Sequence, residues 1–153
     1  MIRQGRKTQF RALVVMGNGR GAAGFGVGKG NRPRTALVDA QKNCVKDIVV
    51  MRLTSFGSLF HETVGEYNNT KVMIRQAPEK SGVKAGHVVS AVCDCLGIRN
   101  VASKVIGRKN PFTVMNATFA ALGLQETPAA KAYRLGRKFV DASRPQLLSK
   151  TKI

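Results

Sequence analysis

The sequence predicts an α+β protein made of two small domains. Two kinds of observation support this: short extended segments that end in glycine and asparagine turns, and helical stripes of apolar residues that follow them. Hydrophobic residues make up 43% of the 153 residues, which allows modest cores and excludes a disordered chain. The expected parts are a first domain over residues 1–53, a second over 54–125 and a basic helical tail over 126–153.

The first domain is expected to form a β-hairpin followed by a helix. Apolar residues alternate from Thr8 to Gly17, as in a strand with one buried face. Asn18 and Gly19 tolerate positive φ and favour a hairpin turn, so the returning strand is expected over Ala22–Val27. Pro33 suits the first turn of a helix. The residues expected on its buried face are Leu37, Ala40, Cys44 and Ile48.

The second domain is expected to begin with two more strands. Extended runs cover Ser58–Val64 and Lys71–Gln76, with Gly65 and Asn68-Asn69 as the turn between them. A glycine-containing loop then leads into a helix. The apolar residues at helical spacing in this helix are Val88, Ala91, Val92, Cys95 and Leu96.

The rest of the chain alternates once more between extended and helical patterns. Ile98–Ile106 is expected to be partly extended, and Gly107–Pro111 to be a basic loop. The residues that line the next helix are Phe112, Met115, Phe119 and Leu122. A last amphipathic helix, which contains Tyr133 and Leu135, is expected to start at Glu126-Thr127-Pro128.

The charge of the chain indicates its class of partner. It carries 26 Lys and Arg against 8 Asp and Glu, a formal net charge of +18, and no acidic residue precedes Asp39. Such a cationic surface neutralises phosphates and releases their counterions, which drives binding to DNA or RNA. Aromatic residues make up only 6% of the chain, so contacts to phosphate and sugar are expected rather than base stacking.

Glycine is concentrated in the turn and returning strand of the predicted hairpin. Seven of the fourteen residues from Gly17 to Gly30 are glycine, which serves either close packing of the hairpin or close approach of the backbone to RNA. The spacing of Gly19, Gly21 and Gly24 matches a dinucleotide-binding motif, but that motif opens a helix, whereas strand-like residues follow here. The Walker pattern fails as well, so a nucleotide site is not expected.

The cysteines favour a reducing, aqueous compartment. There are three, an odd number, and the sequence has neither a signal peptide nor a stretch long enough to cross a membrane. A zinc site at Cys93 and Cys95 with His61 and His87 is not expected, because a spacing of two places the cysteines on different sides of a helix. No metal ion, cofactor or small-molecule substrate is predicted.

Several segments carry a family resemblance. The strand followed by Gly-Asn-Gly-Arg-Gly-Ala-Ala-Gly-Phe-Gly-Val-Gly-Lys at 17–29 and a helix is similar to the first domain of ribosomal small-subunit protein S-five (S5). Segments similar to the second domain of that family follow in the same order: Gln76–Gly86, Leu96–Lys104, Gly107–Pro111 and Met115–Thr118. The ordered set covers about residues 5–124, so the chain is identified as resembling the S5 family.

The resemblance implies a first domain with a fold like that of double-stranded-RNA-binding domains, and a second with a β-α fold of the S5 C-terminal type. It also implies that Gln4-Gly5-Arg6-Lys7 is the tip of a hairpin that reaches into ribosomal RNA. The further residues that it places near RNA are Arg11, Arg20, Lys29, Arg32 and Arg34 in the first domain and Lys104, Arg108, Lys109 and Asn110 in the second.

For function, the resemblance implies a structural constituent of the small ribosomal subunit that supports translation and catalyses no reaction. Members bind small-subunit ribosomal RNA and neighbouring proteins, including the S-four family protein, near the decoding region and the path by which messenger RNA enters. The segment Gly21–Phe25 resembles mitochondrial members. The mitochondrial matrix is therefore the expected location, with the bacterial cytoplasm and the plastid as alternatives.

Two other functions remain open from the sequence. A free RNA-binding regulatory protein would share the charge and the first domain. A small-molecule kinase of related fold would need a serine-rich phosphate loop and acidic groups for magnesium, whereas the loop Pro78–Gly86 has one serine, Ser81, and one acid, Glu79.

The chain departs from the family pattern in two respects. The family's opening strand would precede Gln4, so the strand at Thr8–Gly17 is expected to lack a partner at one edge, whether the chain is a fragment or another polypeptide supplies that strand. Lys80 and His87 stand where the family usually has glycine, and Arg108 where it has serine. The resemblance therefore does not determine the geometry of these loops.

Overall fold

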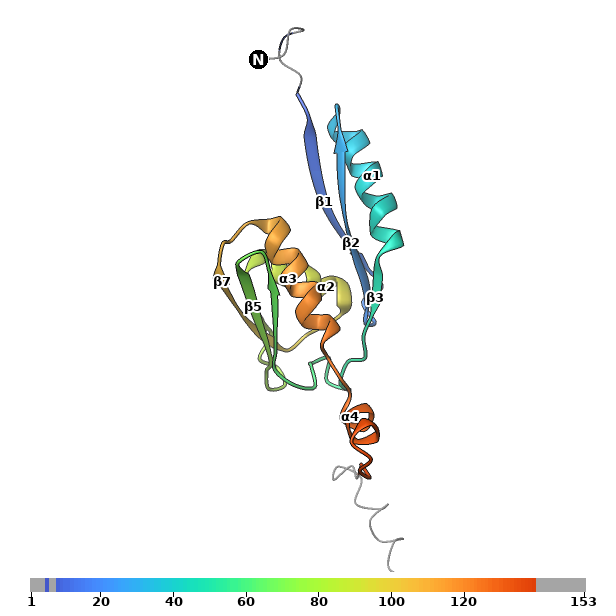
Figure 1. The fold of residues 1–153 in the computed structure, drawn as a ribbon, viewed down its shortest axis with the longest axis vertical. Coiled ribbons are helices and arrows are strands. Elements are labelled where there is room, and N and C mark those ends of the chain that lie inside the picture. The colour runs from blue at the N-terminus through green and yellow to red at the C-terminus, as the bar shows by residue number, and fades with distance from the viewer. Residues whose placement is uncertain (1–4, 6–7, 140–153) are drawn as a thin grey trace, which may run out of the picture.

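The computed structural model describes residue 5 and residues 8–139. They form two halves, each with one sheet covered by helices on one face (Figure 1). The predicted α+β class is confirmed. The expected RNA contacts Gln4, Arg6 and Lys7, and the part of the predicted tail beyond residue 139, lie outside the described residues.

The first half consists of a β-hairpin, a helix and a short third strand. The hairpin strands β1 (Phe10–Gly17) and β2 (Ala22–Gly30) are followed by α1 (Pro33–Lys46) and β3 (Ile48–Val50). The strands form a three-stranded antiparallel sheet in the order β1-β2-β3, with α1 on one face (Figure 1). The predicted order of strand, glycine-rich turn, strand and helix is confirmed, and β2 continues past its predicted end at Val27.

The hairpin turn is closed by an asparagine side chain. Asn18 Oδ1 accepts hydrogen bonds from the N–H groups of Arg20, at 2.8 Å, and Ala22, at 3.0 Å. The positive φ angles fall on Gly19 (66°) and Gly21 (93°), where glycine carries no steric penalty. The predicted turn is confirmed, but Asn18 contributes its side chain rather than a left-handed backbone.

Helix α1 packs close to β2 because both surfaces lack large side chains. Gly26 and Gly28 face the helix, and a Cβ atom at either position would overlap its backbone. The buried residues of α1 are Ala36, Ala40 and Cys44. Two details of the prediction were wrong: Leu37 is 46% exposed, and Ile48 lies in β3 after the helix has ended. Only small residues permit this approach, so they form the contact face instead of the largest apolar ones.

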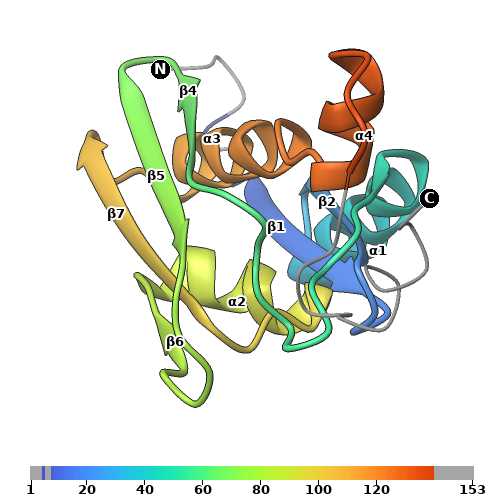
Figure 2. The same cartoon turned by 90° about the horizontal axis from the view of Figure 1, so that it is seen from below.

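The second half is a four-stranded sheet with two helices on one face (Figure 2). Its elements in chain order are β4 (Thr63–Tyr67), β5 (Thr70–Gln76), β6 (Val83–Lys84), α2 (His87–Leu96), β7 (Val101–Gly107) and α3 (Pro111–Gly123). The sheet order is β4-β5-β7-β6, antiparallel except for β6 and β7, which run parallel and are connected by α2. A parallel pair needs such a crossover.

Three details of this half differ from the prediction. β4 begins at Thr63 rather than Ser58, and Gly65 lies inside it instead of in the turn. Glycine suits this position because a Cβ atom there would overlap the backbone of α3. The turn consists of Asn68 and Asn69, with φ of 43° and 59°. The buried residues of α2 are Val89, Val92, Cys93 and Leu96, a stripe rotated from the predicted one.

Helix α3 and the loop before α2 agree with the sequence more closely. Met115, Phe119 and Leu122 of α3 are buried, as predicted. Lys80 has a φ of 64°, in the left-handed region that glycine adopts without strain. The loop thus has a backbone conformation that suits glycine, the residue that the resemblance implied here, although lysine occupies the position.

The two halves share one core. Leu13, Val15 and Phe25 of the first sheet pack against the buried residues of the second half. The rings of Phe25 and Phe119 lie with their centroids 4.8 Å apart. This contact places the sheet of the first half beside α2 and α3.

The hairpin turn also docks on the carboxyl end of α2. The N–H of Gly19 donates to the carbonyl oxygen of Cys95 at 2.9 Å, and the N–H of Gly21 to that of Leu96 at 2.8 Å. A Cβ atom at Gly97 would overlap the backbone of Gly19. The sequence left two roles open for the glycine run, and packing accounts for the glycines at this junction and against α1.

Strand β1 lies at the edge of its sheet, as expected. Within residues 8–139 it pairs with β2 only. Near its carboxyl end, a hollow of about 330 Å³ is lined largely by apolar side chains of β1, β2 and α1. An edge of this kind can accept another extended segment.

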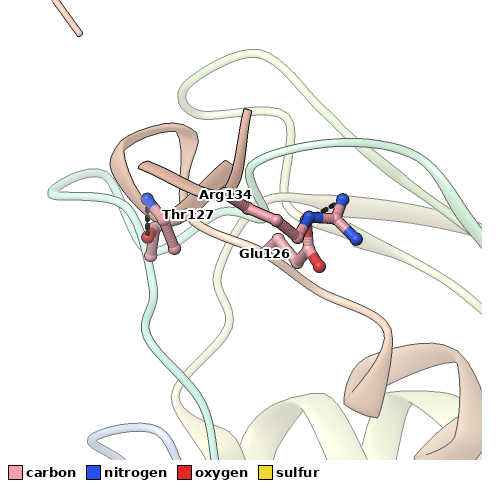
Figure 3. A network of polar contacts seen from close by, with 4 residues as sticks. Glu126, Thr127 and Arg134 are labelled. Atoms are coloured by element: carbon pink, nitrogen blue, oxygen red, sulfur yellow. Dashed lines mark hydrogen bonds and ion pairs between the residues drawn. The ribbon is translucent and has the colours of Figure 1, made fainter. Parts of the chain in front are cut away.

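A short helix follows the second half and buries none of its residues. α4 (Pro128–Arg134) starts after Thr127, whose Oγ1 accepts a hydrogen bond from the N–H of Ala130 at 3.2 Å. Its last residue is tied back by an ion pair of 3.0 Å between Arg134 Nη2 and Glu126 Oε2 (Figure 3). The predicted helix start is confirmed, while its apolar residues stay uncovered in the described structure.

Candidate nucleic-acid interface

Four exposed cations lie at the end of the hairpin opposite its turn, where α1 begins (Figure 1). Arg11 of β1 is the direct cross-strand neighbour of Lys29 of β2. Arg32 and Arg34 occupy the start of α1. These four residues are called the distal basic cluster below.

The distal basic cluster is unfavourable for the isolated protein. Like charges directly opposite each other on a sheet repel, and cations at a helix N-terminus meet the positive end of its dipole. The first turn of α1 holds no acidic residue, and none of the four cations joins an ion pair with a described residue. A bound polyanion would remove this repulsion, so the arrangement suits phosphate.

Gly5 and Arg20 are the other predicted contacts of the first half that the structure describes. Gly5 is exposed, has a φ of 84°, and would place a Cβ atom in open space. Arg20 is exposed in the turn that docks on α2, at the opposite end of the hairpin. The structure therefore does not bring Arg20 together with the distal basic cluster.

The predicted contacts of the second half lie on β7 and on the loop that follows it. Lys104 is exposed on the outer face of the sheet, opposite Met73 of β5. Arg108 and Lys109 are exposed in the loop. Thr70 holds this loop by donating from its Oγ1 to the carbonyl oxygen of Arg108 at 3.0 Å.

Asn110 stabilises the start of α3 as its N-cap residue. Its Oδ1 accepts a hydrogen bond from the N–H of Phe112 at 3.1 Å and caps α3. Its carbonyl oxygen accepts one from Thr113 Oγ1 at 2.9 Å. A cap of this type stabilises a helix by about 1 kcal/mol, which explains asparagine at this position without RNA.

Sequence reasoning missed two cations on the outer face of the second sheet. Lys71 and Arg75 of β5 lie on the same side of the sheet as Lys104 of β7. The alternation of buried and exposed residues along β5 was the available signal. Lys71 also forms an exposed ion pair with Glu66 at 3.3 Å, which contributes little in water.

A cavity of about 280 Å³ opens beside the start of α2. His87, Lys104 and Lys109 line it, and Ser103, whose Oγ is buried without a hydrogen-bond partner in the described structure, contributes to its wall. None of the described residues that line it is acidic. It therefore offers no carboxylate for the magnesium ion that a kinase would use.

The described residues include no group of three or more His, Cys, Asp and Glu side chains able to hold a metal ion. Cys93 is buried in the shared core, whereas Cys95 packs against this core only partly buried and its Sγ donates to the carbonyl oxygen of Val15 at 3.9 Å. The two thiols thus occupy different surroundings.

Among the helices of the described chain, none combines the length and the apolar character required to cross a membrane.

The buried thiols are expected to react slowly. Burial raises the pKa of Cys93 from 9.0 to about 12, and burial also raises the pKa of Cys44 and of Cys95. Because the thiolate is the reactive form, DTNB at pH 8 should label Cys93 of the folded protein far more slowly than that of denatured protein. Rapid labelling of Cys93 in the folded state would contradict its burial.

The free energy of unfolding should also depend on pH through Cys93. Above pH 9 the unfolded chain would release the Cys93 proton while the folded chain keeps it up to about 12, so stability should fall over that range.

Both halves match models of one protein family. Residues 1–52 match the model described as ribosomal protein S5, N-terminal domain. Residues 65–134 match the model described as ribosomal protein S5, C-terminal domain. The two matches occur in the order that the sequence resemblance implied.

Curated relatives agree over most of the chain. The small ribosomal subunit protein uS5 of Phenylobacterium zucineum is 36% identical over 140 residues, which cover 92% of this chain and 72% of the relative. Its counterpart in Maricaulis maris is 37% identical over 92% of this chain and 70% of the relative. That of Sphingopyxis alaskensis is 36% identical over 92% of this chain and 58% of the relative. With both halves matched and relatives above 30% identity, the chain belongs to the ribosomal protein S5 family.

Proposed function

We propose that the chain is a structural protein of the small ribosomal subunit, where it binds ribosomal RNA and neighbouring ribosomal proteins and supports translation. The observation that carries this proposal is the match of both halves, in order, to the S5 family. The net charge of +18 supports it further, since RNA phosphate is a partner that neutralises such a charge.

The alternatives have less support. The S5 family is structural, so the chain is not an enzyme. The cavity beside α2, which has no acidic residue among its described lining residues, also disfavours a kinase. A free RNA-binding regulatory protein could bind RNA with the first half alone. Here the second half is joined to the first through a common core.

The RNA contacts are proposed to be phosphate contacts in three separate regions. The distal basic cluster, with Gln4–Lys7 preceding it in the chain, would bind one RNA segment. Lys104, Arg108 and Lys109 would bind another, because they lie in the other half. Arg20 would contact RNA near the junction, and Asn110 would do so beside its capping role.

The family resemblance also suggests where in the ribosome the chain lies. The resemblance supports a position beside the S-four family protein, near the decoding region and the path by which messenger RNA enters. We assign the ribosome to the mitochondrial matrix, because the segment Gly21–Phe25 resembles mitochondrial members. The bacterial cytoplasm is the alternative with which the bacterial relatives are consistent.

Sedimentation of the tagged chain in a high-salt gradient tests the function. Comigration with small-subunit ribosomal RNA is expected in lysates of isolated mitochondria. Comigration only in lysate that lacks mitochondria would keep the ribosomal role and change the compartment. Recovery in the light fractions, with intact subunits that lack the chain, would overturn the ribosomal role in favour of a free RNA-binding protein.

A further inference from the structure

Helix α4 presents an aromatic ring that the described protein leaves uncovered. Tyr133 is 90% exposed, and Leu135 and Phe139, which follow the helix, are 57% and 51% exposed. The residues one helical turn before Tyr133 are Ala129 and Ala130, which are too small to cover the ring. The ring is therefore open to a flat ligand.

Cations flank this ring on both sides in the sequence. They are Lys131, Arg134, Arg137 and Lys138. No acidic residue occurs between Thr127 and Phe139. Proteins that bind unpaired nucleotides use this combination, in which a base stacks on an exposed ring and cations contact the neighbouring phosphates.

The helix that carries Tyr133 has little support of its own. It comprises seven residues and buries none of them, and isolated helices of this length are marginal in water. Apart from its backbone hydrogen bonds, the side-chain contacts that hold it in the described structure are the Thr127 cap and the exposed ion pair between Glu126 and Arg134 (Figure 3). A partner that covers the ring would stabilise the helix, and the surrounding cations select an anionic partner.

We infer that Tyr133 stacks on an unpaired base of ribosomal RNA, with Arg137 and Lys138 contacting the adjoining phosphates. This inference rests on the proposed function, since the ribosome supplies the RNA. It adds a base contact to the phosphate contacts proposed above. The ligand is single-stranded RNA, because the bases of a duplex are already stacked on one another.

Tyrosine fluorescence can report on this contact directly. The chain has 2 tyrosines and no tryptophan, so Tyr133 is the only such fluorophore in a Tyr67→Phe background. The full chain is titrated with an unpaired oligoribonucleotide of about ten nucleotides, and with an abasic oligonucleotide of equal length, which has the phosphates without the bases. After correction for absorption, we expect quenching by the first and none by the second.

Substitution measures the strength of the contact. Tyr133→Ala is expected to weaken binding of the oligoribonucleotide roughly 5- to 150-fold and to leave binding of the abasic oligonucleotide unchanged. Tyr133→Phe should retain the affinity, because it keeps the ring. Leu135→Ala, which removes an exposed apolar neighbour, is the matched control and should change neither. Unchanged affinity in Tyr133→Ala, or an equal loss for both oligonucleotides, would overturn the inference.

A photoreactive phenylalanine at position 133, incorporated into assembled subunits, separates this inference from the proposed function. Crosslinks to ribosomal RNA are expected. Crosslinks to a protein alone, in subunits that contain the chain, would overturn the stacking role and leave the ribosomal role intact. Absence of the chain from intact subunits would overturn the ribosomal role, and the inference with it.

Discussion

Gly28→Ala is expected to lower the free energy of unfolding of the protein by at least about 3 kcal/mol. A Cβ atom at this position would overlap the carbonyl oxygen of Ala36 and the backbone of Ala40. Backbone atoms cannot turn aside as a flexible side chain can, so α1 would have to shift as a whole away from β2. Urea unfolding followed by circular dichroism measures the change.

Gly123→Ala provides the matched control. Gly123 is the last residue of α3, and a Cβ atom there would meet nothing within 4 Å. Because alanine favours the helix over glycine, this variant should be as stable as the wild type or more stable by up to about 1 kcal/mol. If Gly28→Ala matched it, α1 would not lie against β2 as closely as described.

Replacing the distal basic cluster with glutamine should weaken binding of transcribed small-subunit ribosomal RNA by roughly 100-fold at physiological salt. Each lost phosphate contact should reduce the slope of log affinity against log salt by about 0.7 to 0.9, so four should reduce it by about 3. The fold should be kept or slightly stabilised, because Arg11 and Lys29 no longer repel each other across the strands. Filter binding over a range of salt concentrations measures both quantities.

A second variant with the same change in net charge separates contact from general attraction. Its four exposed cations, also replaced with glutamine, lie outside the cluster and the other proposed contacts: Lys42, Lys46, Arg52 and Arg99. This variant should lose much less affinity. Equal losses in the two variants would mean that the net charge, rather than the distal basic cluster, determines binding.

Much of the fold could be predicted because its signals are local. Proline stands at the first positions of α1, α3 and α4, and the turn between β4 and β5 consists of the two asparagines that tolerate positive φ. The contact face of α1 could not be predicted in the same way. It is determined by Gly26 and Gly28 on another element, so a search for large apolar residues selected Leu37 instead.

The candidate site, too, has some features that the sequence predicts and others that depend on the fold. Composition predicts phosphate binding, and strand pairing then decides which cations meet, as with Arg11 and Lys29. The separation of Arg20 from them was available from the sequence, because a hairpin places its turn far from its open end. The exposure of Tyr133 was not, since apolar residues at helical spacing ordinarily indicate a buried face.

The docking of the hairpin turn on α2 has a consequence for how this family can diverge. The hydrogen bonds from Gly19 and Gly21 reach carbonyl oxygens, which every residue possesses whatever its side chain. The junction requires glycine at Gly17 and Gly97, where a Cβ atom would overlap the backbone of the other half, together with the apolar contacts of Leu13, Val15 and Phe25. The outer surface of each half can therefore vary while the residues of the junction are kept. Halves taken from two relatives that keep these residues could be joined into a folded chimera.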